Sequence, residues 1–155
     1  MTTETLEQAI RPGVPVLLDS TALISYLDGT ERTSPIAIHI VDAFIKSGRN
    51  PAYVSAVSAM EVLVRPLRTG PAPGMHAYNF LTRTHNLYVV DVDLPISHQA
   101  ASLRATHQLK PVDALVTASG TMYGVEALVT NDAKWRRLPA TIGAVCYLEA
   151  HLPFS

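Results

Sequence analysis

Five short apolar runs alternate along this chain with longer segments that have the residue spacing of amphipathic helices. The runs are VPVLLD, AYVSA, LYVVDVD, EALVTND and AVCYLEA, which begin at residues 14, 52, 87, 126 and 144. A strand that is buried on both faces of a sheet is apolar throughout rather than at every second residue, so these runs are typical of parallel strands. The alternation therefore predicts an α/β fold, with a mostly parallel five-stranded sheet that is covered by helices on both faces.

The length and composition of the chain are those of one folded domain. Its 155 residues are enough for one domain with a substantial core, and 48% of them are apolar while 16% are charged. Such a composition argues against disorder. We expect residues 1–13 to be a polar N-terminal leader and residues 14–155 to form a single domain.

The composition also excludes several classes of function. The apolar runs are too short to span a membrane and the first ten residues do not have the pattern of a signal peptide, so we expect a cytoplasmic protein that does not associate with membranes. Cys146 is the single cysteine, which excludes an internal disulfide and leaves a thiolate zinc site short of ligands. The net charge of −1 implies that any contact with nucleic acid depends on local basic clusters.

Three local patterns predict where helices begin and end. Ser20 or Thr21 can cap the helix that follows the first strand, because a hydroxyl accepts hydrogen bonds from the first free N–H groups of a helix. Pro66 is expected to kink or end the helix in which it lies, since a proline inside a helix costs about 3 kcal/mol. The segment TGPAPG, residues 69–74, is rich in glycine and proline and is expected to be a loop.

Four of the thirteen acidic residues lie beside apolar segments rather than on polar faces. Asp19 and Asp132 come at the ends of the first and fourth strands, and Glu61 follows the second strand by about one and a half helical turns. Asp113 opens the helix that precedes the fourth strand. Because ligands of parallel α/β sheets bind outside the carboxyl ends of the strands, all four acids are expected at one edge of the sheet.

Carboxylates that converge without partners destabilise a fold, because like charges and the loss of water both disfavour the ionised form. Mg²⁺ or Mn²⁺ would remove this cost, since both ions prefer oxygen ligands and keep several bound waters. Such an ion can position a phosphodiester and activate a water. Asp19 and Asp132 are the first candidates for direct ligands. Asp113 could bind the ion or orient its water, and Glu61 could do either or act as a base.

Each acid also has a simple structural explanation when it is taken alone. Asp19 could cap a helix, Asp132 could form an Asx turn in TND, and Asp113 suits the first turn of a helix. Glu61 could pair with Arg65, four residues further on. Four such residues at one edge of the sheet are much harder to explain by chance, so together they favour a site.

Four motifs with these acids resemble the PIN domain family, and most closely its VapC-type toxin ribonucleases. The motifs are LLDSTALISYL, VSAVSAMEVL, LKPVDALVTASG and ALVTNDAKW, and the likeness runs from Val14 to about Glu149. The resemblance implies a three-layer α/β/α sandwich on a five-stranded parallel sheet, dependence on Mg²⁺ or Mn²⁺, and endonucleolytic cleavage of RNA. It also implies a homodimer and a small antitoxin protein that occludes the site.

The resemblance assigns roles to individual residues. The four acids of the family correspond to Asp19, Glu61, Asp113 and Asp132, which would be catalytic or bind the metal. Ser20 and Thr130 fall where the family often has a supporting hydroxyl. Gly120 is a departure, because alanine is usual there and a glycine is expected to weaken the helix by about 1 kcal/mol.

Basic residues follow two of the acids and could contact the phosphates of RNA. They are Arg65, Arg68, Lys134, Arg136 and Arg137. Solvated surface is an equally good explanation for them.

The sequence thus predicts a metal-dependent endoribonuclease, the toxin of a VapBC-type toxin–antitoxin pair. The alternative is a PIN-like module that binds RNA or a protein without cutting. The DVD motif, Asp91 to Asp93, has some likeness to the nucleophile motif of haloacid-dehalogenase phosphatases, but a strand end followed by a helix cap explains it better.

Overall fold

The computed structural model describes residues 4–138 and 142–154, and it contains one five-stranded parallel sheet. The strand order is β3-β2-β1-β4-β5, with β1 in the centre. The strands are β1 (Val16–Leu18), β2 (Ala52–Ser55), β3 (Leu87–Val90), β4 (Ala127–Thr130) and β5 (Ala144–Tyr147). All four neighbouring pairs are parallel, which confirms the predicted α/β class and the five predicted strands.

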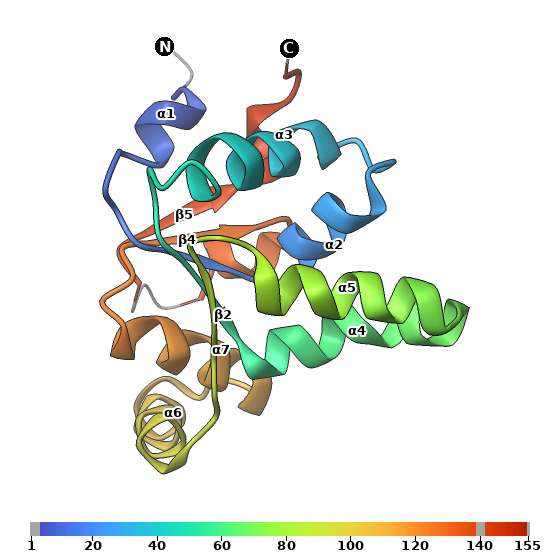
Figure 1. Ribbon diagram of the computed structural model, residues 1–155. Helices are drawn as coiled ribbons and strands as arrows, with labels where there is room; N and C mark the ends of the chain where they lie inside the picture. Colours follow the sequence, from blue (N-terminus) through green and yellow to red (C-terminus); the bar gives the residue numbers. More distant parts are fainter. Residues whose placement is uncertain (1–3, 139–141, 155) are drawn as a thin grey trace.

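Helices connect the strands and cover both faces of the sheet (Figure 1). They are α1 (Leu6–Ala9), α2 (Ser20–Asp28), α3 (Ser34–His39), α4 (Ala56–Thr69), α5 (Pro71–Arg83), α6 (Leu94–His107) and α7 (Pro111–Met122). A π-helix, η1 (Ile40–Ile45), continues α3, and two short 3₁₀ helices, η2 (Ala133–Arg136) and η3 (Leu148–His151), flank β5. Figure 1 shows α4 and α5 as a helical hairpin that projects from one side of the molecule. Among the described residues, no helix is long and apolar enough to cross a bilayer.

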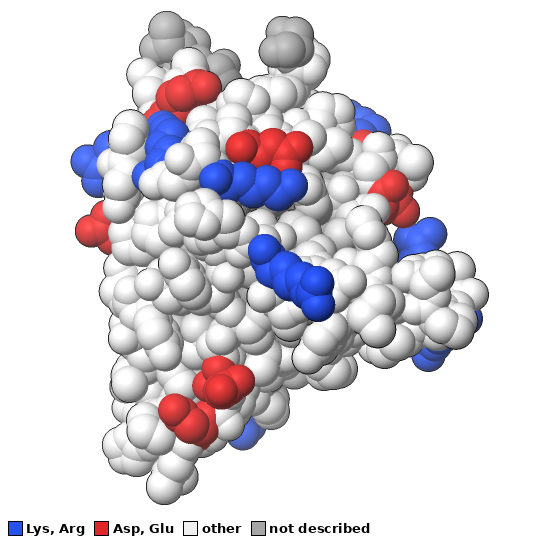
Figure 2. All heavy atoms as spheres, viewed as in Figure 1, with Lys and Arg blue, Asp and Glu red and all other residues white. Residues whose placement is uncertain are grey.

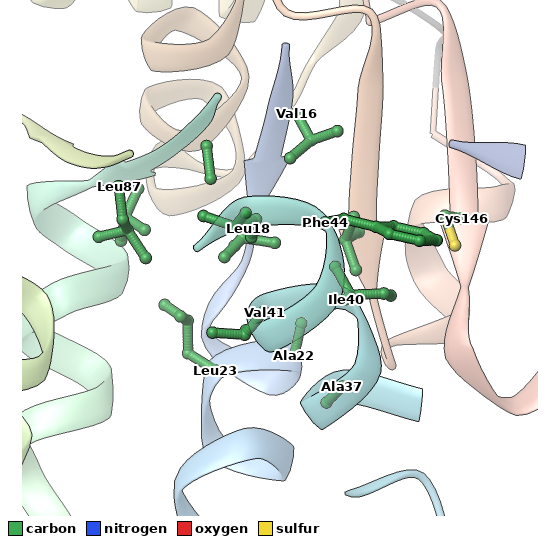
Figure 3. Packing of buried hydrophobic residues seen from close by; sticks show 14 of the residues in the cluster. Val16, Leu18, Ala22, Leu23, Ala37, Ile40, Val41, Phe44, Leu87 and Cys146 are labelled. Carbon is green, nitrogen blue, oxygen red and sulfur yellow. The ribbon is translucent and has the colours of Figure 1, made fainter. Parts of the chain in front are cut away.

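The two faces of the sheet have separate hydrophobic cores. Val16 and Leu18 of β1 point to the face covered by α1, α2, α3 and η1, where Leu23, Ile40 and their neighbours pack against them (Figure 3). Leu17, between them in the strand, points to the opposite face and packs with α7. Because successive side chains of a strand point to opposite faces, an apolar run of three residues contributes side chains to both cores. The result is the predicted three-layer α/β/α sandwich.

Gly120 has a packing role that its helix propensity does not reveal. A Cβ atom at this position would lie 2.9 Å from Cδ2 of Leu17 and 3.1 Å from Cδ1 of Ile142. The missing side chain therefore lets α7 lie close to the centre of the sheet, where Leu17 is fully buried. The departure from the family's alanine is compensated by close packing.

Three local predictions differ from the structure. The segment 69–74 is not a loop, because α5 begins at Pro71; the first N–H groups of a helix have no helical partner, so prolines in the first turn lose nothing. Likewise, α4 continues through Pro66 to Thr69, so the proline does not end the helix. The cap of α2 is Asp19 rather than Ser20 or Thr21, since its carboxylate accepts the N–H of Ala22.

The N-terminal segment contributes to the main core. Thr5 and Gln8 form a capping box around α1, and Leu6 and Ile10 are 4% and 0% exposed in the cluster that contains β1. The polar leader predicted for residues 1–13 thus carries two side chains that are as buried as those of the central strand.

Candidate active site

The carboxyl ends of β1 and β4 lie side by side at the point where the strand order reverses. The chain runs from β1 outward to β2 and β3 on one side, and β4 and β5 lie on the other. Leu18 is paired with Val129, and the N–H of Asp19 donates to the Val129 carbonyl oxygen at 3.1 Å, so the ladder extends to Asp19. In α/β proteins, ligands bind outside the strand ends at such a reversal of strand order.

Asp19 follows β1 directly at this reversal and is 4% exposed. Its Oδ1 accepts hydrogen bonds from the N–H of Ala22 at 3.0 Å and the hydroxyl of Thr21 at 2.7 Å, and its Oδ2 accepts the Thr130 hydroxyl at 2.5 Å. Burial raises the pKa of Asp19 and the charge of Asp132 raises it further, while the three hydrogen bonds lower it. Within the described residues, Asp19 has no cationic partner.

Asp113 and Asp132 share one ammonium group. Nζ of Lys134 lies 2.9 Å from Oδ1 of Asp113 and 3.4 Å from Oδ2 of Asp132. Asp113 lies in the first turn of α7 and is 5% exposed, whereas Asp132 is partly exposed and caps η2 by accepting the N–H of Lys134 at 3.0 Å. These contacts bring the start of α7 and the end of β4 together.

Glu61 completes the group from the exposed face of α4. Partial loss of hydration raises its pKa, the positive charge of Lys134 lowers it, and the negative charges of Asp19 and Asp113 raise it. It does not pair with Arg65, because that guanidinium lies 3.3 Å from Asp28 instead. Glu61 also lines a largely apolar cavity of about 240 Å³ between α2, α4 and α5.

The four acids therefore lie within electrostatic reach of one another, as the strand-end argument predicts. Over the ranges 4–138 and 142–154, however, no three acidic, histidine or cysteine side chains are arranged to hold a metal ion as they stand, and Lys134 lies between two of the acids. The donor set still fits Mg²⁺ or Mn²⁺, because every candidate ligand is a carboxylate oxygen and one ammonium cannot balance four carboxylates.

Of the two predicted supporting hydroxyls, only that of Thr130 forms a hydrogen bond with these acids among the described residues. It donates to Asp19 and accepts the N–H of Asp132 at 2.9 Å. Ser20 makes no hydrogen bond to these acids in the described part of the chain. Its role falls to Thr21, which sequence reasoning considered only as a helix cap; the Thr21 hydroxyl also accepts the N–H of Asn131 at 2.7 Å. A hydroxyl two residues after an acid is the local signal that would have pointed to it.

Within the described residues, three of the five predicted RNA-binding residues contact other groups of the protein. Lys134 points into the acid cluster, Arg65 pairs with Asp28, and the guanidinium of Arg136 lies 5.1 Å from the centre of the Tyr147 ring. Arg68 and Arg137 are exposed and form no ion pair among the described residues. Figure 2 shows charges of both signs in small groups separated by uncharged surface.

The acid of the DVD motif that precedes α6 has a structural role. Asp93 caps α6 by accepting the N–H of Ile96 at 3.0 Å, and its side chain lies outside the acid cluster. This contact agrees with the choice of a helix cap over a phosphatase nucleophile.

Replacing Thr130 by Val is expected to destabilise the protein by about 2 kcal/mol, because a buried carboxylate and the Asp132 N–H each lose a partner. Replacing Ser20 by Ala, which removes a hydroxyl beside the same acid, should change stability by less than about 0.5 kcal/mol. Urea unfolding of both variants measures the difference. Equal stabilities would contradict the role given to Thr130.

Comparison with known proteins identifies relatives of this fold. A sequence model of the PIN domain matches residues 16–140. No curated protein sequence matches the chain.

Similar solved structures include VapBC2 from Rickettsia felis bound to a DNA fragment from its promoter, at 13% identity and a TM-score of 0.64, covering 84% of this chain and 96% of that one. VapC20 of Mycobacterium tuberculosis, described as a sarcin–ricin loop cleaving toxin, has 16% identity and a TM-score of 0.63 and covers 79% and 93%. VapBC-5 of the same species, a member of the VapBC family of toxin–antitoxin systems, has 15% identity and a TM-score of 0.56 and covers 86% and 98%. At these identities the likeness establishes a shared fold.

Proposed function

This chain belongs to the PIN domain family, and from that premise we propose that it is a metal-dependent endoribonuclease, the toxin of a VapBC-type toxin–antitoxin pair. The observation that carries the proposal is the environment of Asp19. A carboxylate that is 4% exposed lies where the strand order reverses, has no cationic partner among the described residues, and is joined there by three further acids. Such an arrangement costs stability, and binding a divalent cation compensates for it.

In the proposed mechanism, Asp19, Asp113, Asp132 and Glu61 would hold Mg²⁺ or Mn²⁺. When bound, the ion would supply an activated water and neutralise charge on the phosphodiester. Thr21 and Thr130 fix the orientation of the Asp19 carboxylate through their hydrogen bonds. Glu61 is the acid with the most exposed setting and a raised pKa, so it is suited to take the proton from the attacking water.

Binding partners follow from the same proposal. Arg65, Arg68, Arg136 and Arg137, and Lys134 when it leaves the acids, would contact RNA phosphates near the acid cluster. A cognate antitoxin protein is proposed because structures with the same fold come from toxin–antitoxin systems. We also propose a homodimer, as the family resemblance implies.

The test is cleavage of RNA by the purified full chain with Mg²⁺ or Mn²⁺, compared with the same reaction in excess chelator. Cleavage should require the ion, stop in chelator, and return when the ion is added back. RNA that is bound but never cut, with either ion, would instead favour a PIN-like binding module. A protein that cuts equally well in chelator would contradict the metal-dependent mechanism.

A further inference from the structure

We propose that Lys134 is a built-in counter-cation of the acid cluster, which a divalent ion must displace before it can bind both Asp113 and Asp132. This inference rests on the proposed function, because it assumes that the cluster binds such an ion. It differs from a role in RNA binding, since it concerns the protein before any substrate is present. It predicts that Lys134 weakens metal binding and stabilises the metal-free fold.

Both the side-chain ammonium and the backbone N–H of Lys134 contact the acids. Its ammonium lies 2.9 Å from Oδ1 of Asp113 and 3.4 Å from Oδ2 of Asp132, while its own backbone N–H donates to Oδ1 of Asp132 at 3.0 Å. Both oxygens of Asp132 are therefore engaged by the same residue. Because Asp113 is 5% exposed, its ion pair with Lys134 is shielded from water on the acid's side.

A divalent ion bound to Asp113 and Asp132 would use the oxygens that the ammonium now contacts. The two cations cannot occupy this place together, since they would repel each other at short range with little water between them. Binding of the ion therefore requires that Lys134 give up its ion pairs with Asp113 and Asp132. This competition lowers the apparent affinity of the cluster for metal, because the competent state is only one part of the population.

The lysine is able to leave without disturbing the fold. Its side chain is 48% exposed and flexible, so the ammonium can move into solvent. The backbone beside it is fixed independently, because Asp132 caps η2 and the next residue, Trp135, is only 8% exposed within the core. Displacement is thus a change of one side chain and not of the helix that carries it.

Removing the ammonium should have two effects of opposite sign. Without metal, Asp113 and Asp132 lose their counter-charge and repel each other, so the protein becomes less stable. With metal, the competitor is gone, so binding becomes tighter. If Lys134 merely stabilised the fold, its replacement would give the first effect alone. If Lys134 supported the metal, its replacement would weaken metal binding.

The experiment uses the full chain and its Lys134→Met variant, which keeps most of the length of the side chain but removes its charge. Thermal melting in chelator and calorimetric titration with Mn²⁺ measure the two effects. We expect a lower melting temperature without metal and a dissociation constant for Mn²⁺ that falls about tenfold, within the usual range of coupling between sites. Lys134→Gln serves as a second uncharged variant if the first does not fold.

Arg136→Met is the matched control, since it removes one positive charge from the same short helix, where the guanidinium lies over Tyr147 and not on the acids. Its affinity for Mn²⁺ should stay close to that of the wild type. Unchanged or weaker Mn²⁺ binding by Lys134→Met, in a wild type that binds the ion and cuts RNA, would overturn this inference alone. A wild type that neither binds Mn²⁺ nor cuts RNA would overturn the proposed function as well.

Discussion

Replacing Asp19 by Asn will lower the rate of RNA cleavage by about a thousandfold or more, a loss of roughly 4 kcal/mol of transition-state stabilisation. The size of the effect follows from the position of this acid, which is the most central of the four. Among the described residues, it is the only one of them whose two oxygens are both fixed by hydroxyl groups. An amide cannot balance the charge of a divalent ion. Single-turnover cleavage with saturating Mn²⁺ measures the loss directly.

The same substitution should make the metal-free protein more stable at neutral pH. Burial raises the pKa of Asp19, so the folded protein binds this proton more tightly than the unfolded chain, whose value is near 3.8. Stability is therefore lost as the pH rises from about 3.8 through the pKa of the folded state, and it stays reduced above that. Asn removes this cost, so we expect a gain in stability at pH 7 that shrinks as the pH falls.

Asp93→Asn is the matched control for both effects. Asp93 caps α6 through the N–H of Ile96 as Asp19 caps α2 through that of Ala22, but it is exposed and lies outside the cluster. Because Asn caps a helix about as well as Asp, this variant should keep both its stability and its cleavage rate. Urea unfolding in chelator at pH 7 and pH 4.5 gives the stabilities of the two variants. An Asp19→Asn protein that still cuts RNA at the wild-type rate would refute the assignment.

Growth provides an independent measure of the toxin role. Expression of the wild-type chain without an antitoxin should arrest growth, and Asp19→Asn should relieve the arrest. A wild type that cuts RNA but does not slow growth would indicate a housekeeping nuclease in place of a toxin.

The fold was predictable from the sequence because buried strands can be identified from their own residues. Strands that are covered on both faces must be apolar throughout, as VLL in β1 is, and the acids that follow such runs are placed at the edge of the sheet by topology alone. The convergence of Asp19 and Asp132 needed no knowledge of side-chain conformations. It depended only on β1 and β4 being parallel neighbours.

The partners of the acids were less predictable, because they are set by contacts between distant segments. The i,i+4 rule pairs Glu61 with Arg65, but the end of α2 brings Asp28 to that guanidinium instead. Thr21 and Thr130 flank Asp19 from positions 109 residues apart. Lys134 looks like a surface cation in the sequence, and only the approach of α7 to the end of β4 turns it toward Asp113.

The order of the N-terminal segment also depends on contacts with distant residues that the local sequence does not reveal. Its polar composition suggests a leader, and α1 has only four residues and cannot persist in water by its own hydrogen bonds. Its order depends on burying Leu6 and Ile10 against the helices and strands of the main core. Two apolar positions in a polar stretch are too few to reveal this from the sequence.

Replacing both Leu6 and Ile10 by Ala is therefore expected to cost about 4–8 kcal/mol, from two buried truncations of 2–5 kcal/mol each that share one core region. Since domains of this size are stable by about 5–15 kcal/mol, the variant should be largely unfolded at 37 °C or close to it. Arg11→Ala, an exposed change in the same segment, should shift stability by less than about 0.5 kcal/mol. Urea unfolding compares the three proteins.

Deleting residues 1–13 should be at least as damaging, for a reason beyond the two side chains. Asn50 is completely buried, and its Nδ2 donates to the carbonyl oxygens of Arg11 and Val14 at 2.8 Å each. The deletion removes the first of these acceptors and leaves a buried amide with one bond fewer, which adds roughly 1–3 kcal/mol to the loss of packing. A truncated protein as stable as the full chain would show that the segment is a leader after all, and that the domain begins at residue 14.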